Sequence, residues 1–225
     1  MIRQTSSIST ILFDWDGTLL DSAPSALLTF QKTFQQLGVD LSEEVYESIY
    51  SPNWYSMYEA VGLSRDRWDL ADELWLRYHA EFPVQLVLNA QSILRELADR
   101  GYRLGLVTSG TGSRVRREAS ALGVMPLLEM LVCNEDTDNK KPHPEPLQRA
   151  MTAMRQAAQN CCYVGDSPED IRMGKSAGLL TVAVMGEYPC SKRLRDASPD
   201  IFLEKLAQIL DHFGPRAVTS AIRRS

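Results

Sequence analysis

Short, continuously apolar runs recur along the chain, with longer stretches of helical spacing between them. Runs such as ILF, LGLV and LLTVAV do not alternate with polar residues, which is typical of strands buried on both faces of a parallel sheet. The repeated change from strand to helix predicts an α/β fold built from βαβ units. The expected strands are 10–14, 103–108, 130–133, 161–165 and 180–184.

Glycine and proline mark the ends of the expected helices. Residues 113–122 are predicted to form a helix that ends at Gly123, and residues 168–177 a helix that ends before Gly178. A third helix is expected over 144–158, because prolines are tolerated in a first helical turn.

The segment between the first two strands is too long for one βα connection. It contains helical patterns and no convincing strand: 25–37 closes on Gly38, and 67–82 ends at Pro83. An insert of this length is expected to form a helical subdomain of its own.

The pattern divides the chain into three parts. An α/β core is expected from residues 1–20 and 90–215, with the helical subdomain over 21–89. Residues 216–225 have little to pack against and are expected to form a flexible tail.

Composition and charge narrow the class of protein. A chain of 225 residues with 44% hydrophobic and 24% charged residues is ordinary for a soluble globular protein. The formal net charge of -5 and the pI near 5.3 argue against a nucleic-acid-binding role. There is no signal peptide core and no run of the roughly 18 apolar residues that a membrane span needs. Four cysteines without CxxC spacing predict reduced thiols and a cytoplasmic location.

Two carboxylates stand two residues apart in FDWDGT, where the first expected strand ends. Ligand sites in open α/β sheets lie outside the carboxyl ends of strands. A carboxylate such as Asp14 can attack phosphorus, and a second acid such as Asp16 can protonate the leaving oxygen and later activate water. Gly17 permits a sharp turn and Thr18 offers a hydroxyl. Taken alone, the motif is equally compatible with an acidic turn.

A second acidic segment, VGDSPED, again follows an apolar strand and leads into a helix. Asp166 together with Asp14 would suit magnesium, which prefers a few carboxylates plus water and phosphate oxygens. Asp170 lies in the first helical turn, where it could orient a ligand or a bound water. The structural alternative is that Ser167 caps the helix and Asp170 interacts favourably with its N-terminus.

Two weaker segments complete the set. Thr108, Ser109 and Gly110 follow the strand LGLV, where a hydroxyl and backbone N–H groups can hold phosphate oxygens. Lys140 or Lys141, before Pro142, can supply a cation that offsets charge on the phosphoryl group. Each segment alone is more typical of an ordinary polar loop.

In order and position, the four segments resemble the motif set of the haloacid dehalogenase superfamily. FDWDGTLLDSAP is similar to the first motif, LVTSG to the second, KKPHPEP to the third and YVGDSPEDIRMGKSAG to the fourth. The resemblance covers nearly the whole chain. It implies a Rossmann-like, doubly wound parallel sheet of order 5-4-1-2-3, with the inserted subdomain acting as a helical cap that closes over the site.

The resemblance also implies a role for each matching residue. Asp14 would be the nucleophile and Asp16 the general acid and base. Thr108 would bind phosphate with Ser109 and Gly110. Lys141, directly before Pro-x-Pro, would balance charge and contact the substrate.

The resemblance further implies a magnesium ion. Its ligands would be Asp14, Asp166 and the backbone carbonyl of Asp16, with Asp170 beside them. The implied activity is a Mg2+-dependent phosphatase, forming an aspartyl phosphate on a small phosphorylated metabolite.

The branch that the chain most resembles contains phosphoglycolate phosphatases, because PDIFLEKLAQIL is similar to their closing strand and helix. Phosphoglycolate is therefore one candidate substrate, beside sugar phosphates, nucleotides and pyrophosphate. A monomer or a homodimer is expected.

A loop over 50–54 is expected to face the site, while Trp54, Tyr55 and Tyr58 are expected in the cap core. Arg65 and Arg67 are expected on a solvated face. None of the histidines, His79, His143 and His212, has a partner at metal-ligand spacing.

Three other activities and a non-catalytic role compete with a phosphatase on the same motifs. Dehalogenases and phosphonatases of this fold lack the second acid, which is present here as Asp16. A phosphomutase of the β-phosphoglucomutase type keeps both acids and stays open. A non-catalytic binding protein would be expected to have lost an active-site acid, and none is missing.

Overall fold

Six parallel strands form one sheet in the computed structural model, which describes residues 5–216. The spatial order is β3-β2-β1-β4-β5-β6, so the expected α/β, Rossmann-like parallel sheet of order 5-4-1-2-3 is confirmed, with one further strand at its edge. The strands are β1 Thr10–Phe13, β2 Arg103–Val107, β3 Met130–Val132, β4 Cys161–Gly165, β5 Leu180–Val184 and β6 Ile201–Leu203.

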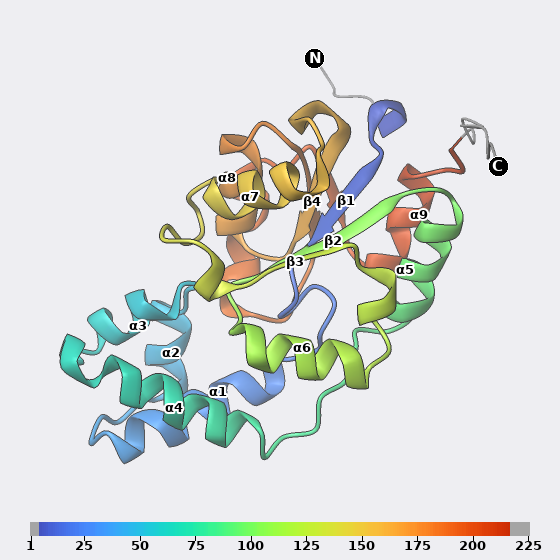
Figure 1. Cartoon of the computed structure of the whole chain (residues 1–225). Coiled ribbons are helices and arrows are strands. Elements are labelled where there is room, and N and C mark those ends of the chain that lie inside the picture. Colours follow the sequence, from blue (N-terminus) through green and yellow to red (C-terminus); the bar gives the residue numbers. More distant parts are fainter. Residues whose placement is uncertain (1–4, 217–225) are drawn as a thin grey trace.

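Helices cover both faces of this sheet (Figure 1). In β1, Ile11 and Phe13 belong to one hydrophobic core and Leu12 to the other, because successive side chains of a strand point to opposite faces. The first core also takes residues from α5 Ala90–Asp99, α6 Gly112–Ala121 and α9 Ile209–His212, and the second from α7 Glu145–Met154 and α8 Pro168–Ser176. Short 3-10 turns occupy Thr5–Ser7, Arg65–Arg67, Met125–Leu127, Asn134–Asp136, Ala158–Asn160, Pro189–Arg193, Arg195–Ala197 and Leu206–Gln208.

One helix ends earlier than its sequence pattern indicates. The expected helix over 144–158 stops at Met154, because Arg155 adopts a left-handed conformation with φ of 52°. Such a residue closes a helix rather than continuing it.

Between β1 and α5 the chain forms a separate helical unit, at the lower left of Figure 1. It consists of α1 Ala23–Gln36, α2 Glu43–Ile49, α3 Trp54–Ala60 and α4 Trp68–His79. The unit has its own core, which is rich in aromatic rings such as Phe30, Phe34 and Tyr58. Its two connections to the sheet run side by side, since the Asp21 N–H donates to the Gln85 carbonyl at 2.9 Å.

The C-terminal end of the described chain packs against the core. The Arg216 N–H donates to the Arg100 carbonyl at 3.0 Å, so the first residue of the expected tail is held, and 217–225 lie outside the described residues. Within residues 5–216, no helix combines the length and apolar character needed to cross a membrane.

Candidate active site

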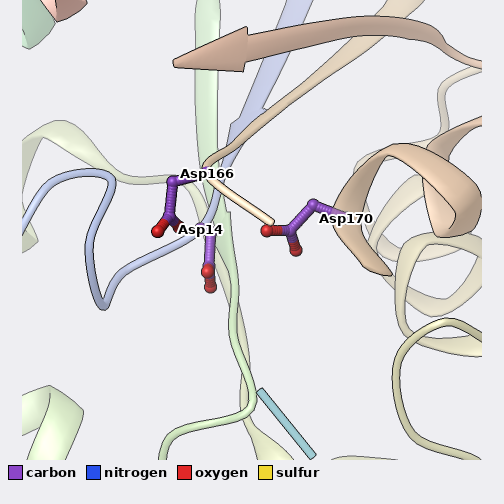
Figure 2. A group of neighbouring side chains, drawn as sticks. All are labelled: Asp14, Asp166 and Asp170. Atoms are coloured by element: carbon purple, nitrogen blue, oxygen red, sulfur yellow. The ribbon is translucent and has the colours of Figure 1, made fainter. Parts of the chain in front are cut away.

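Three predicted site residues follow directly from three neighbouring strands. Phe13 in β1 pairs with Leu106 in β2 and Val164 in β4, so Asp14, Thr108 and Asp166 emerge at the same edge of the sheet. All three side chains are buried, and Figure 2 shows Asp14 and Asp166 projecting from this edge. Parallel strand register alone therefore brings together Asp14 and Asp166, which are 152 positions apart in the chain.

Two glycines make room for these carboxylates. Gly17 has φ of +79°, and a Cβ there would overlap the carboxylate of Asp166 and meet Tyr188 at 2.7 Å. At Gly165 a Cβ would lie 2.5 Å from Cβ of Asp170. Any larger residue at either position would push a carboxylate out of the site.

The acidic cluster consists of Asp14, Asp166 and Asp170. One carboxylate oxygen from each lies within 4.8 Å of the others. Lys141 is buried among them, with its Nζ 2.8 Å from Oδ1 of Asp14 and 2.7 Å from Oδ1 of Asp170. Lys140 instead donates to the backbone carbonyls of Asn134 and Thr137.

Electrostatics in the cluster favour an added cation. Burial raises the pKa of Asp14 to about 7, against the lowering effect of Lys141 and with the help of Asp170. Burial likewise raises the pKa of Asp166, and Asp170 and Asp14 add to the rise. The pKa of Lys141 is also raised, because its two carboxylate partners outweigh its burial. Three carboxylates against one lysine leave negative charge that a divalent metal with oxygen ligands would offset.

Asp170 is fixed by its own helix. Its Oδ2 accepts from the Ser167 N–H at 3.1 Å and from the Ser167 hydroxyl at 2.6 Å, while the Asp170 N–H donates to Ser167 Oγ at 3.1 Å. The Tyr163 hydroxyl also contacts Oδ1 of Asp170 at 3.2 Å. This capping box holds the carboxylate toward Lys141, so the structural and functional interpretations of the segment are compatible.

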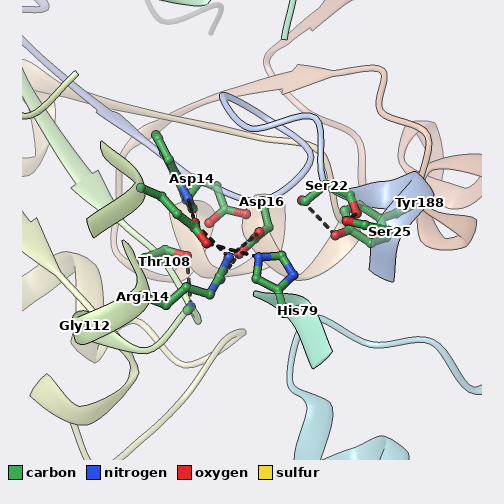
Figure 3. Close-up of polar contacts among 12 residues, drawn as sticks. Asp14, Asp16, Ser22, Ser25, His79, Thr108, Gly112, Arg114 and Tyr188 are labelled. Carbon is green, nitrogen blue, oxygen red and sulfur yellow. Dashed lines mark hydrogen bonds and ion pairs between the residues drawn. The ribbon is translucent and has the colours of Figure 1, made fainter. Parts of the chain in front are cut away.

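Asp16 points away from the acidic cluster and pairs with an arginine. Its carboxylate accepts from Nη1 of Arg114 at 3.0 Å and from Nη2 at 2.5 Å (Figure 3). Burial acts to raise the pKa of Asp16, but Arg114 more than offsets it, so the pKa lies below its usual value. Asp16 is thus ionised in this arrangement.

The partner of Asp16 belongs to a buried network that joins the sheet to the helical unit. Glu118, one turn after Arg114 on α6, accepts from Arg114 Nη1 at 3.1 Å and from Trp15 Nε1 at 3.0 Å. Its Oε1 lies 3.1 Å from Nε2 of His79 at the end of α4, and His79 stacks on Trp75 with ring centroids 4.6 Å apart. Our sequence reasoning missed Arg114, Glu118 and His79. The i,i+4 spacing of Arg114 and Glu118 in the predicted helix after Thr108 is a signal from which their ion pair could have been predicted, whereas no sequence spacing relates His79 to them.

Thr108 closes the predicted phosphate loop. The Gly110 N–H donates to Thr108 Oγ1 at 3.0 Å, so this amide is already engaged. The hydroxyl proton of Thr108 can then donate outward to an anion. Ser109 is half-buried and lines the same cavity as Thr108 and Gly110.

A cavity of about 840 Å³, counting the space open to solvent, lies between this edge of the sheet and the helical unit. The loop over 50–54 faces it, through Tyr50, Ser51, Pro52 and Trp54. Tyr50 stacks on Tyr188 of the sheet domain with ring centroids 4.7 Å apart. The expectation for Trp54 and Tyr58 was incomplete, because both pack in the core of the helical unit and also line the cavity.

The family model described as haloacid dehalogenase-like hydrolase matches residues 11–184. The chain belongs to this family. It is 30% identical over 210 residues to the pyrophosphatase PpaX of Bacillus pumilus, covering 91% of this chain and 96% of that protein. The expected family membership and enzyme class are confirmed.

Solved structures of similar fold include a predicted phosphoglycolate phosphatase from Haemophilus somnus. It has a TM-score of 0.79 and 23% identity, and the match covers 91% of this chain and 97% of that one. CbbY from Rhodobacter sphaeroides, solved with xylulose-(1,5)bisphosphate, has a TM-score of 0.76 and 21% identity, covering 92% and 99%. At these identities the likeness concerns the fold.

The remaining sequence expectations for this haloacid dehalogenase-like hydrolase concern two arginines and a histidine that do not line the cavity. Arg65 is exposed and pairs with Glu59 at 3.1 Å. Arg67 donates to the Leu37 carbonyl at 3.0 Å. His143 Nδ1 accepts from the Glu145 N–H at 3.2 Å. These contacts hold loops and helix ends.

Proposed function

We propose that the chain is a Mg2+-dependent phosphatase that transfers the phosphoryl group of a small phosphorylated metabolite to Asp14 and then to water. The observation that carries this proposal is the contact of Asp14 with Lys141 at 2.8 Å, in a buried acidic cluster that opens into the cavity. A carboxylate beside a fixed cation suits attack on an anionic phosphorus centre.

The proposed metal ligands are the carboxylates of Asp14, Asp166 and Asp170, with the backbone carbonyl of Asp16. The proximity of the three carboxylates and the raised pKa of Asp14 and Asp166 support a divalent ion there. Once bound, Mg2+ would supply Lewis-acid stabilisation of charge on the phosphoryl oxygens.

In the proposed first step, an Asp14 oxygen attacks phosphorus in line with the leaving alcohol. The P–O bond to the alcohol breaks as the new P–O bond to Asp14 forms, and Asp16 gives its proton to the departing oxygen. Lys141 offsets the charge on the phosphoryl oxygens, and the Thr108 hydroxyl donates to one of them. In the second step Asp16 takes a proton from water, which attacks phosphorus and frees phosphate from Asp14.

The ion pair with Arg114 bears on these two steps differently. Because Arg114 keeps Asp16 ionised, the arrangement suits the base of the second step. To act as an acid in the first step, Asp16 must leave Arg114 and take up a proton. We infer that Asp16 turns toward the phosphoryl group when substrate fills the cavity.

The helical unit over 21–89 is proposed as the cap that excludes water and contacts the leaving group. Its contacts with the sheet domain, through His79 to Glu118 and Tyr50 to Tyr188, support closure over the cavity. A cytoplasmic location is part of the proposal. It is supported by four cysteines that form no disulfide.

Relatives leave the substrate open, because their names cover pyrophosphate, phosphoglycolate and a sugar bisphosphate. The phosphomutase alternative has weaker support. A sugar bisphosphate carries a second phosphate, which would need a cationic partner. Within the described chain, Arg114 and Lys141 line the cavity, and both are already paired with carboxylates.

The test is phosphate release from a panel of phosphomonoesters, with and without Mg2+, for the wild-type chain and Asp14→Asn. The proposal expects Mg2+-dependent release that falls by roughly 10⁴-fold or more in the variant. Asp40→Asn, an exposed carboxylate of the cap, is the matched control and should keep full activity. Substantial release by a folded Asp14→Asn protein would refute the nucleophile.

A further inference from the structure

The cap side of the cavity is lined mainly by aromatic rings. The rings are Phe30, Tyr50, Trp54, Tyr58 and Trp75 from the cap, with Tyr188 from the sheet domain. Aromatic faces carry partial negative charge and attract cations, and Trp and Tyr are the best of them.

One carboxylate stands among these rings. Asp72 on α4 lines the cavity, and it accepts from Trp54 Nε1 at 2.9 Å, from the Tyr58 hydroxyl at 2.8 Å and from the Tyr55 hydroxyl at 3.2 Å. All three donors are neutral. An ionised carboxylate has about four acceptor positions, so Asp72 keeps one for a ligand.

Asp72 has no cationic partner within residues 5–216. None of the ion pairs of the described chain includes it, in contrast to Asp14 and Asp16. Burial raises the pKa of Asp72 above its usual value, against hydrogen bonds from Tyr58, Trp54 and Tyr55 that lower it. A bound cation would remove this penalty by pairing with the carboxylate.

The same cavity is poorly suited to a second anionic group. Nζ of Lys141 contacts Asp14 and Asp170, and the guanidinium of Arg114 contacts Asp16 and Glu118. A leaving group that carries a carboxylate or a phosphate would therefore face Asp72 without a free cation among the described lining residues. Its desolvation would be uncompensated.

We propose that the leaving alcohol of the substrate carries an organic cation, a primary amine or a quaternary ammonium, which lies among the cap rings and pairs with Asp72. This inference rests on the proposed phosphatase function and names its substrate class. Cation–π attraction to the rings and Coulomb attraction to Asp72 act on the same group, so both would disappear if the positive charge were replaced by carbon.

The test compares phosphocholine with its neutral carbon isostere, 3,3-dimethylbutyl phosphate, and ω-aminoalkyl phosphates of two to six carbons with the matching alkyl phosphates. For at least one pair, kcat/KM should favour the cation by at least roughly tenfold. In Asp72→Asn this ratio should fall toward one. Asp69→Asn, an exposed carboxylate on the same helix, should keep the wild-type ratio.

A binding arm separates this inference from the chemistry. Titration calorimetry on Asp14→Asn measures Kd for the same pairs without turnover. Because the cap of this variant is wild type, the measured Kd does not depend on whether Asp72→Asn folds. The inference would be overturned if kcat/KM and Kd did not differ within any pair, or if the ratio were unchanged in Asp72→Asn. It would also be overturned if pyrophosphate, phosphoglycolate or nucleoside monophosphates were turned over faster than every amine. Turnover of 4-nitrophenyl phosphate without cation preference would overturn it alone and leave the phosphatase standing. Cation-selective binding without any hydrolysis would refute the phosphatase, and with it the substrate class, and would leave only a binding site for an organic cation.

Discussion

The two walls of the cavity handle charge in opposite ways. At the edge of the sheet, Asp14 and Asp16 each have a cationic partner, Lys141 and Arg114. On the cap, Asp72 has only neutral donors around it. The carboxylates of Asp14 and Asp16 are therefore each paired with a cation where we place the phosphoryl chemistry, whereas the carboxylate of Asp72 is unpaired within residues 5–216, where we place the leaving group.

This difference suggests that the sheet edge determines the reaction and that the cap determines which substrate is accepted. Strand register holds the acids of the sheet edge, and the loss of Asp14 or Asp16 removes an ion pair from a buried site. The cap contacts the sheet domain through side chains on both sides of the cavity, among them His79 on Glu118 and Tyr50 on Tyr188. Changes at the sheet edge should therefore abolish activity, and changes in the cap should redistribute it among substrates.

After the loss of the nucleophile in Asp14→Asn, the largest expected effect concerns the metal. Asp166→Asn removes one of three clustered carboxylates, so Mg2+-dependent phosphate release should fall by at least about 10²-fold. In wild type, saturating Mg2+ should raise the melting temperature, by linkage worth about 2.7 kcal/mol at 100 times Kd. That rise should be absent in Asp166→Asn and intact in the exposed control Asp196→Asn. An equal Mg2+ shift in all three proteins would place the ion elsewhere.

Next in size is the loss of Arg114. Arg114→Ala leaves Glu118 buried without its cation and frees Asp16, so we expect a destabilisation of roughly 3–5 kcal/mol in urea unfolding and a lower kcat. Arg114→Lys restores the charge but not the two-pronged contact and should recover only part of the loss. The neighbouring exposed Arg116→Ala should stay within about 0.5 kcal/mol of wild type. Equal stability of Arg114→Ala and Arg116→Ala would show that the network contributes nothing.

A smaller effect is expected in the cap. Tyr55→Phe removes one hydrogen bond to Asp72 and keeps the ring that stacks on Trp68 with centroids 5.1 Å apart. The free energy of unfolding should fall by about 1 kcal/mol, measured by urea denaturation. Tyr78→Phe, which loses a hydroxyl contact to Gln36 at the exposed side of the cap, is the matched control and should change less. A loss of several kcal/mol in Tyr55→Phe would mean that the ring itself had moved.

The smallest effect is a pH dependence of the cap carboxylate. Folding raises the pKa of Asp72, so above about pH 4 the native chain binds more protons than the unfolded chain, and stability falls as the pH rises. Asparagine does not titrate. The stability of Asp72→Asn relative to wild type should therefore increase with pH above about 4, measured by urea unfolding without ligand. A difference that is constant between pH 4 and pH 8 would contradict the raised pKa.

Much of the fold could be predicted because its signals are local. Continuous apolar runs marked the first five strands, and glycine after α6 and α8 marked where these helices end. The end of α7 was misplaced, since the left-handed turn at Arg155 is not encoded by a glycine. The acids after β1 and β4 were identified as candidates because each stands in a short motif at a strand end.

The contacts that shape specificity could not be predicted in this way. Asp16 and Arg114 are 98 positions apart, and His79 and Glu118 are 39 apart. No periodicity relates such residues. The aromatic pattern of the cap predicted burial for Trp54 and Tyr58 but not that each ring would also line the cavity.

The amino-acid order thus determines the sheet, the position of the acids at its edge and the family to which the chain belongs, because strand and helix preferences and short motifs act over a few neighbouring residues. Folding decides which charges are balanced. Coulomb and cation–π energies depend on distance in space and on burial, and only the packed chain sets these for Asp16 beside Arg114 and for Asp72 among the cap rings.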